Sequence, residues 1–187
     1  SVPAINIYDR ATGERVDYCE PSVTVSFGEA TIGIIGAIGD CYSSISGDKV
    51  SDIYFKTGDE LNSLISAESE RLRASGADFI VLSLHDSGAD IELSKEHVDL
   101  VFEGHTHKSY VRPDKHGVYH LQGGGDNDGI THVEAVINVA GGESYVKTAE
   151  YISSDKYDDS PSDPIVDELM KKYASEVAKA DEVLGKN

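Results

Sequence analysis

Three histidines follow directly after two short apolar runs, and their spacing is that of a metal site. His85 follows the run 79–84, and His105 and His107 follow the run 98–102. Short apolar runs bounded by polar residues predict buried strands. Because functional groups gather at the carboxyl ends of strands in open α/β sheets, we expect the three imidazoles to share one small volume. Neutral imidazole binds zinc and other first-row divalent ions, and three histidines can hold one ion with a position left for water.

The residues beside the histidines suggest how the imidazoles are oriented. In an extended segment, residues two apart point to the same side, so His105 and His107 are expected to face one site. Gly104 would let the backbone turn tightly just before them. Asp86, next to His85, is a candidate for orienting a ligand from outside the coordination sphere, and an exposed loop carboxylate is an equal alternative.

The other histidines and the cysteines have no such context. We interpret four histidines as structural or solvated: His97, His116, His120 and His132. Two cysteines permit a single disulfide, but Cys19 and Cys41 lie in unrelated segments, and their spacing predicts neither a disulfide framework nor a metal site.

The surrounding pattern predicts an α/β layered domain. Thr57 and Glu60 have the spacing of a capping box, and the apolar residues after them predict a helix that stops at Gly76. A right-handed crossover would make 79–84 and 98–102 parallel neighbours. Alternation and turn residues predict a hairpin of 23–27 with 31–38, antiparallel strands at 118–121, 131–139 and 145–152, and a final helix over 165–184 with one apolar stripe.

The charge and the apolar content of the chain argue against some classes of binding partner. The 187 residues fit one domain and carry a formal charge of −18. That balance argues against nucleic acid and against docking on anionic membranes, which both need lysine and arginine. No stretch approaches the ~20 apolar residues that a membrane-spanning helix needs. A phosphorylated small molecule stays compatible with the charge if metal ions supply the local positive field.

At the histidines the chain resembles the calcineurin-like metallophosphoesterases. That family carries a lone histidine after one strand and Gly-His-x-His after the next, which here are His85 and the segment Gly104-His105-Thr106-His107. Flanking segments, among them the loop Gly123-Gly124-Gly125, are similar to the bacterial 5′-nucleotidase and nucleotide-phosphodiesterase branch. The resemblance runs from about residue 5 to 184.

The resemblance implies a mixed-sheet layered αββα fold and hydrolysis of nucleotide phosphoesters by the intact protein, as a 5′-nucleotidase or cyclic-nucleotide phosphodiesterase. It implies two divalent ions, zinc or manganese, with His85 and His105 on one and His107 on the other. Gly124 and Asn127 become candidates for a loop that contacts substrate. Members of the branch usually work outside the cytoplasm, so the resemblance also implies an extracellular or cell-envelope location.

The departures from the family pattern are equally specific. Asp-x-His, Gly-Asp and Gly-Asn-His, which supply most ligands and the catalytic histidine, are not present in the required order. We therefore expect residues 1–187 to be the C-terminal portion of one catalytic domain, without its N-terminal half and without the nucleotide-recognition domain. Such a chain would hold at most one ion, loosely, and no catalytic residue. The missing half, or self-association, would have to cover the exposed sheet.

Two other functions remain open at this point. The missing ligands would also suit a non-catalytic module that keeps the fold for binding or assembly. A single-zinc hydrolase that uses the three histidines alone is the third alternative, although no clear general base lies near them in the sequence.

Overall fold

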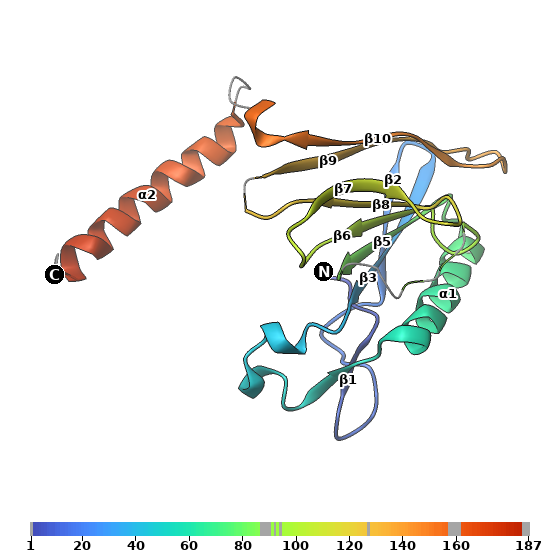
Figure 1. The fold of residues 1–187 in the computed structure, drawn as a ribbon, viewed down its shortest axis with the longest axis horizontal. Coiled ribbons are helices and arrows are strands. Elements are labelled where there is room, and N and C mark those ends of the chain that lie inside the picture. Colours follow the sequence, from blue (N-terminus) through green and yellow to red (C-terminus); the bar gives the residue numbers. More distant parts are fainter. Residues whose placement is uncertain are drawn as a thin grey trace. The chain divides into compact units, whose positions relative to one another are not determined.

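A six-stranded mixed sheet forms the centre of the first of two units into which the chain divides (Figure 1). The computed structural model describes residues 2–86, 91, 93, 95–126, 128–156 and 162–184. The units are residues 1–154 and 155–187. The sheet is ordered β2-β3-β5-β6-β8-β7, with β2 at Ser22–Phe27, β3 at Ala30–Ile38, β5 at Phe79–His85, β6 at Leu100–Glu103, β7 at Ser109–Pro113 and β8 at Tyr119–Gly123.

The strand pairing confirms most of the predicted order. β2 and β3 form the expected antiparallel hairpin, and β3, β5, β6 and β8 are parallel neighbours. The expectation that the strand near 118–121 is purely antiparallel was wrong, because β8 is parallel to β6 and antiparallel only to β7. β7 was not predicted at all. It is a partly exposed edge strand that ends in Pro113, a residue confined to such edges, so it lacks an apolar signature.

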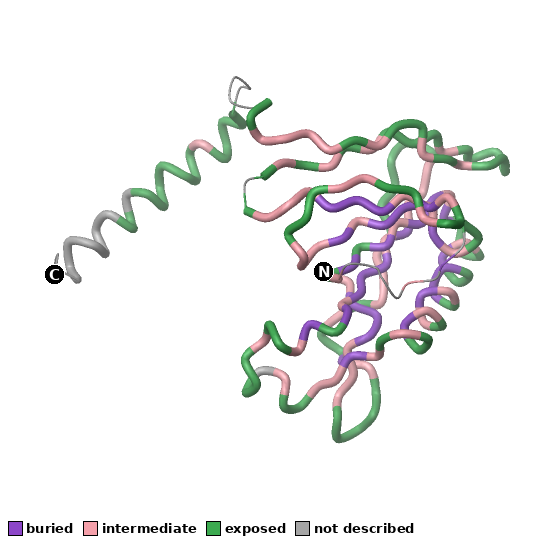
Figure 2. The backbone as a smooth tube through the Cα atoms, in the orientation of Figure 1, coloured by how far each residue is buried: buried purple, intermediate pink, exposed green. Residues whose placement is uncertain are grey.

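Each face of the sheet packs against a different layer. Helix α1, Gly58–Ala74, covers one face through Leu61, Ile65 and Leu72, which belong to the main core cluster. The hairpin of β9, Gly129–Val136, with β10, Tyr145–Ser153, packs on the other face around a second cluster. Figure 2 shows the buried backbone concentrated in the central strands and along α1. This α, β, β layering is the part of the expected αββα arrangement that the chain supplies.

The helix α1 occupies the predicted range, but its start differs in detail. Thr57 is the N-cap residue with extended backbone, yet its side chain makes no capping hydrogen bond, so the predicted capping box does not form. Asp59 and Glu60 in the first turn and Arg71 and Arg73 in the last still complement the helix dipole.

At the carboxyl end of β5, the side chains on the face that packs against the β9–β10 hairpin are exposed. Alternate residues of β5 face α1 and are buried, whereas Phe79 and Val81 on the opposite face belong to the second cluster. Ser83 and His85 continue that second row, and both are exposed. The sheet therefore presents an uncovered edge where the predicted metal site should lie.

A buried asparagine ties the N-terminal segment to the end of β3. The Asn6 amide donates to the carbonyls of Ile38 at 2.5 Å and Lys56 at 2.8 Å, and its Oδ1 accepts from the Ile38 N–H at 3.1 Å. Asn6 is fully buried. It also joins the central sheet to the small sheet of β1, Ile7–Asp9, and β4, Ile53–Phe55.

Asn6→Ala is expected to lower the free energy of unfolding by about 2–4 kcal/mol, because it leaves buried backbone groups without partners. Urea unfolding measures the change. The control is Asn138→Ala, whose exposed side chain accepts one bond from the Ala140 N–H and should cost less than about 1 kcal/mol. Equal losses in the two variants would refute the structural role of Asn6.

The remaining elements are short 3₁₀ turns and one long helix. The turns are η1 at Tyr42–Ser44, η2 at Gly47–Lys49 and η3 at Ser154–Lys156. Helix α2, Pro164–Leu184, belongs to the second unit and begins where the Asp163 carboxylate accepts from the Ile165 N–H at 2.7 Å. The predicted stripe of α2 is exposed at Ile165, Leu169, Tyr173 and Val177. Among the described helices, none is long and apolar enough to span a membrane.

Candidate metal centre

Two of the three predicted histidines lie side by side at the carboxyl ends of adjacent parallel strands. His85 is the last residue of β5, and His105 follows β6 after one glycine. The Gly104 N–H donates to the Leu84 carbonyl at 3.0 Å, which holds the two strand ends together. The His85 and His105 ring centroids are 5.1 Å apart at an interplanar angle of 65°. The strand-end rule thus placed these two imidazoles correctly.

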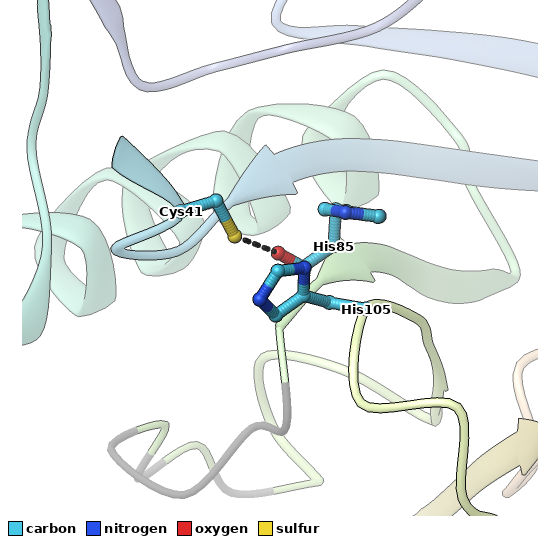
Figure 3. A group of neighbouring side chains, drawn as sticks. All are labelled: Cys41, His85 and His105. Atoms are coloured by element: carbon cyan, nitrogen blue, oxygen red, sulfur yellow. Dashed lines mark hydrogen bonds between the residues drawn. The ribbon is translucent and has the colours of Figure 1, made fainter. Parts of the chain in front are cut away.

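A cysteine lies beside these two histidines. The Cys41 Sγ and one ring nitrogen from each of His85 and His105 all lie within 4.8 Å of one another (Figure 3). Cys41 follows the carboxyl end of β3, which pairs with β5, and the spacing of the two cysteines in the sequence did not predict this position beside the histidines. The same strand-end rule, applied to a third strand, would have found it. Its thiol currently donates to the His85 carbonyl at 3.2 Å.

His107 lies outside this group of donors within the described part of the chain. The expectation of an extended segment was wrong: φ is 81° at His105 and 56° at His107, in the left-handed region. The His107 ring instead rests against Gly125, where an added Cβ would lie 2.8 Å from His107 Cγ. Its predicted role as the ligand of a second ion stays a prediction.

A buried glutamine forms hydrogen bonds with the loop that carries His105 and His107. Gln122, 2% exposed, accepts at Oε1 from the Thr106 hydroxyl at 2.9 Å and from the Lys108 N–H at 3.2 Å. Its amide donates to the Tyr110 hydroxyl at 3.3 Å. These bonds fix a loop with two histidines in a conformation that costs about 1–3 kcal/mol per residue.

A buried carboxylate supports the same loop. Glu103 lies one residue before Gly104, and its Oε1 is 2.6 Å from Nδ1 of His120, with both side chains at most 6% exposed. The Tyr110 hydroxyl donates to the other carboxylate oxygen. His120, interpreted from the sequence as structural or solvated, is structural: it partners the buried Glu103.

Burial shifts the pKa values of His85 and Cys41 in opposite directions. Burial lowers the pKa of His85, and the neighbouring His105 and His107 lower it further, against an opposing contribution from Asp86. His85 is therefore neutral at physiological pH, the form that binds metal. Burial raises the pKa of the Cys41 thiol, and the charges of Asp86 and Asp40 add to this.

The predicted neighbours of the histidines take different positions from those expected. Gly104 does not have left-handed backbone. The absence of a side chain still matters there, because an added Cβ would lie 3.3 Å from His85 Nδ1. The Asp86 carboxylate packs against Gly39, where an added Cβ would lie 1.8 Å from its oxygen.

The predicted substrate loop lies next to His107. Gly124 has φ of 87°, and its N–H donates to the Lys108 carbonyl at 3.1 Å. The loop continues to Gly125, which touches the His107 ring as described above. Asn127, the second candidate of this loop, lies outside the described residues.

Gly104→Ala is expected to reduce zinc affinity about tenfold, because the added methyl displaces the His85 ring. His85 is exposed and can move aside, so the unfolding free energy should change by less than about 1 kcal/mol. Zinc affinity is measured by competition with a chromophoric chelator. Gly47→Ala, which points into open space, is the control and should leave affinity unchanged. An unaltered affinity in Gly104→Ala would show that the ring is not crowded.

Comparison with known proteins identifies the fold. No protein-family model matches the sequence, and no curated protein is significantly similar to it. A 5′-nucleotidase precursor from Thermus thermophilus superposes with a TM-score of 0.70 at 18% identity, over 96% of this chain and 38% of its own. An NAD nucleotidase from Haemophilus influenzae gives a TM-score of 0.65 at 16% identity, over 95% of this chain and 41% of its own.

A calcineurin-like phosphoesterase from Bacillus subtilis gives a TM-score of 0.54 at 15% identity, over 79% of this chain and 53% of its own. The chain thus spans between about a third and a half of the structures that it matches. These findings confirm the fold that the resemblance implied. The chain has the mixed α/β fold of the calcineurin-like phosphoesterases and 5′-nucleotidases, and it matches the C-terminal half of that fold.

Proposed function

We propose that this chain supplies the C-terminal half of the catalytic domain of a metal-dependent phosphoesterase that acts on nucleotides. The observation that carries the proposal is the pair His85 and His105, adjacent at neighbouring strand ends of a metallophosphoesterase fold. The similarity to two nucleotidases supports a nucleotide as the substrate.

The donor set fits a transition metal ion. His85 and His105 would hold one ion between them, and His107, beside the loop of Gly124, would hold the second. When bound, a pair of divalent ions supplies an activated water and neutralises charge that develops on the phosphoryl group. Since the chain carries a net charge of −18, an anionic substrate needs such local positive charge.

The remaining site groups are proposed to come from sequence outside these residues. Among the described residues, the group around His85 contains no carboxylate that could bridge two ions. We place the bridging aspartate, the asparagine ligand and the proton-donating histidine in an N-terminal half, and the nucleotide-recognition domain beyond α2. A location outside the cytoplasm is part of this proposal, and it rests on the resemblance to the 5′-nucleotidase branch.

The test compares the 187-residue chain with a longer protein that includes the coding sequence before Ser1. Phosphate release from AMP and turnover of bis(p-nitrophenyl) phosphate are measured with Mn²⁺ or Zn²⁺ and after metal removal. The longer protein should be active only with metal, and the shorter chain inactive. In the longer protein, His85→Ala should abolish turnover, whereas His116→Ala, at an exposed turn, should not.

Two results would overturn the proposal. Strong turnover by the shorter chain would contradict the divided site. A longer protein that binds no metal and hydrolyses no phosphoester would favour a non-catalytic binding or assembly module, whereas two bound ions per chain would count against such a module.

A further inference from the structure

We propose that Cys41 is a third metal ligand, and that Cys41, His85 and His105 form a zinc-selective site with one sulfur and two nitrogen donors. The three donor atoms lie within 4.8 Å of one another. This inference rests on the proposed function, because it uses the same two histidines. The new element is Cys41, whose sulfur would determine which metal ion the site binds.

The backbone fixes Cys41 beside His85. β3 and β5 are in register so that Ile38 pairs with His85, and the Gly39 N–H donates to the His85 carbonyl at 3.3 Å. The Cys41 N–H then donates to the Gly39 carbonyl at 2.9 Å. Because Asn6 also bonds both backbone groups of Ile38, the start of the turn that presents the thiol is anchored to two neighbouring segments. Cys41 is 2% exposed and has little freedom to move away.

Two carboxylates lie close enough to the Cys41 thiol to act on it electrostatically. The Asp86 carboxylate packs against Gly39, and only a residue without a side chain fits there. Asp40 precedes Cys41, and both carboxylates act electrostatically on the thiol. A cation bound by Cys41, His85 and His105 would therefore lie in a favourable field.

Small movements would bring the donors to coordination distance. Donors on a tetrahedral zinc ion lie about 3.5 Å apart, as Zn–S and Zn–N bonds of about 2.3 and 2.0–2.1 Å require. The His85 ring is exposed and the His105 ring half-buried, so rotation of these rings can close a gap of about 1 Å toward the fixed sulfur. Binding would release the thiol proton that now points to the His85 carbonyl.

The thiolate determines selectivity. Sulfur ligands favour zinc and cobalt over magnesium and manganese, which prefer carboxylate, carbonyl and water oxygens. In the 187-residue chain by itself, three protein ligands leave a fourth position open to water. The chain alone should consequently bind one Zn²⁺ ion in preference to Mn²⁺.

Cobalt titration of the 187-residue chain tests the proposal. Wild-type protein should show the near-ultraviolet thiolate-to-cobalt charge-transfer band. Cys41→Ser should lose that band and bind Zn²⁺ at least about tenfold more weakly, with a smaller preference over Mn²⁺. Cys19→Ser is the matched control and should keep both. X-ray absorption of the wild-type zinc complex should show one sulfur neighbour at about 2.3 Å, which decides the question even if Cys41→Ser fails to fold.

Two outcomes would overturn the assignment: a bound metal ion without a sulfur neighbour, or a charge-transfer band that survives in folded Cys41→Ser. Either result leaves the phosphoesterase proposal standing if His85→Ala still abolishes turnover of the longer protein. Conversely, a sulfur-ligated zinc in a longer protein without phosphoesterase activity would refute the proposed function and retain the site.

Discussion

His120→Leu is expected to lower the free energy of unfolding by about 3–5 kcal/mol, the cost of removing one partner from a buried pair. The Glu103 carboxylate would lose the His120 nitrogen at 2.6 Å and keep only the Tyr110 hydroxyl in a site closed to water. Because Glu103 lies two residues before His105, the loosened strand end should also weaken zinc binding.

Urea unfolding and zinc competition measure both effects, and the chain offers a matched control. His132 faces Glu150 at 3.4 Å on the exposed hairpin, so His132→Leu should cost less than about 1 kcal/mol. The double variant Glu103→Leu/His120→Leu should recover much of the loss, because it leaves no unpaired buried carboxylate. If the double variant were as unstable as His120→Leu, the loss would have to come from packing or from the lost contact of His120 Nε2 with Asp114 at 3.6 Å, and not from an unpaired Glu103.

The architecture was largely predictable because its signals are local. β5 is a seven-residue strand that is apolar except for its serine and its final histidine, α1 repeats its buried leucine and isoleucine side chains at helical spacing, and the β2–β3 turn carries a glycine. β7 gave no such signal, because an edge strand buries little and its residues are accordingly polar or half-buried. It pairs with β8 through backbone bonds that do not depend on side-chain type.

The positions of site residues that depend on strand ends were predictable from the sequence. The positions that depend on the conformation of a loop were not. His85 and His105 meet because parallel neighbouring strands end at one edge of the sheet. The left-handed backbone at His105 and His107 depends on bonds from the distant Gln122, which no local pattern reveals. Cys41 is 44 residues from His85 in the chain, and only the order of strands in the sheet brings them together.

The second large effect concerns the two histidines of the Gly-His-x-His segment, which should behave differently. His105→Ala is expected to reduce zinc affinity by more than about 100-fold, because it removes a direct ligand. Removing a residue that only hydrogen-bonds a ligand typically reduces metal affinity by about 10–100-fold. His107→Ala should reduce it by less than about tenfold, because His107 lies outside the donor group and rests on Gly125. Isothermal titration with a competing chelator measures both affinities.

Equal losses in the two variants would mean that His107 joins the first ion. That outcome would require the loop to leave the conformation that Gln122 holds, since His107 now lies outside the donor group that contains His105. Gln122→Leu separates the cases because it frees Thr106 and the Lys108 N–H. If the existing loop presents His105 correctly, Gln122→Leu weakens zinc binding. If the loop must rearrange first, the same variant strengthens it.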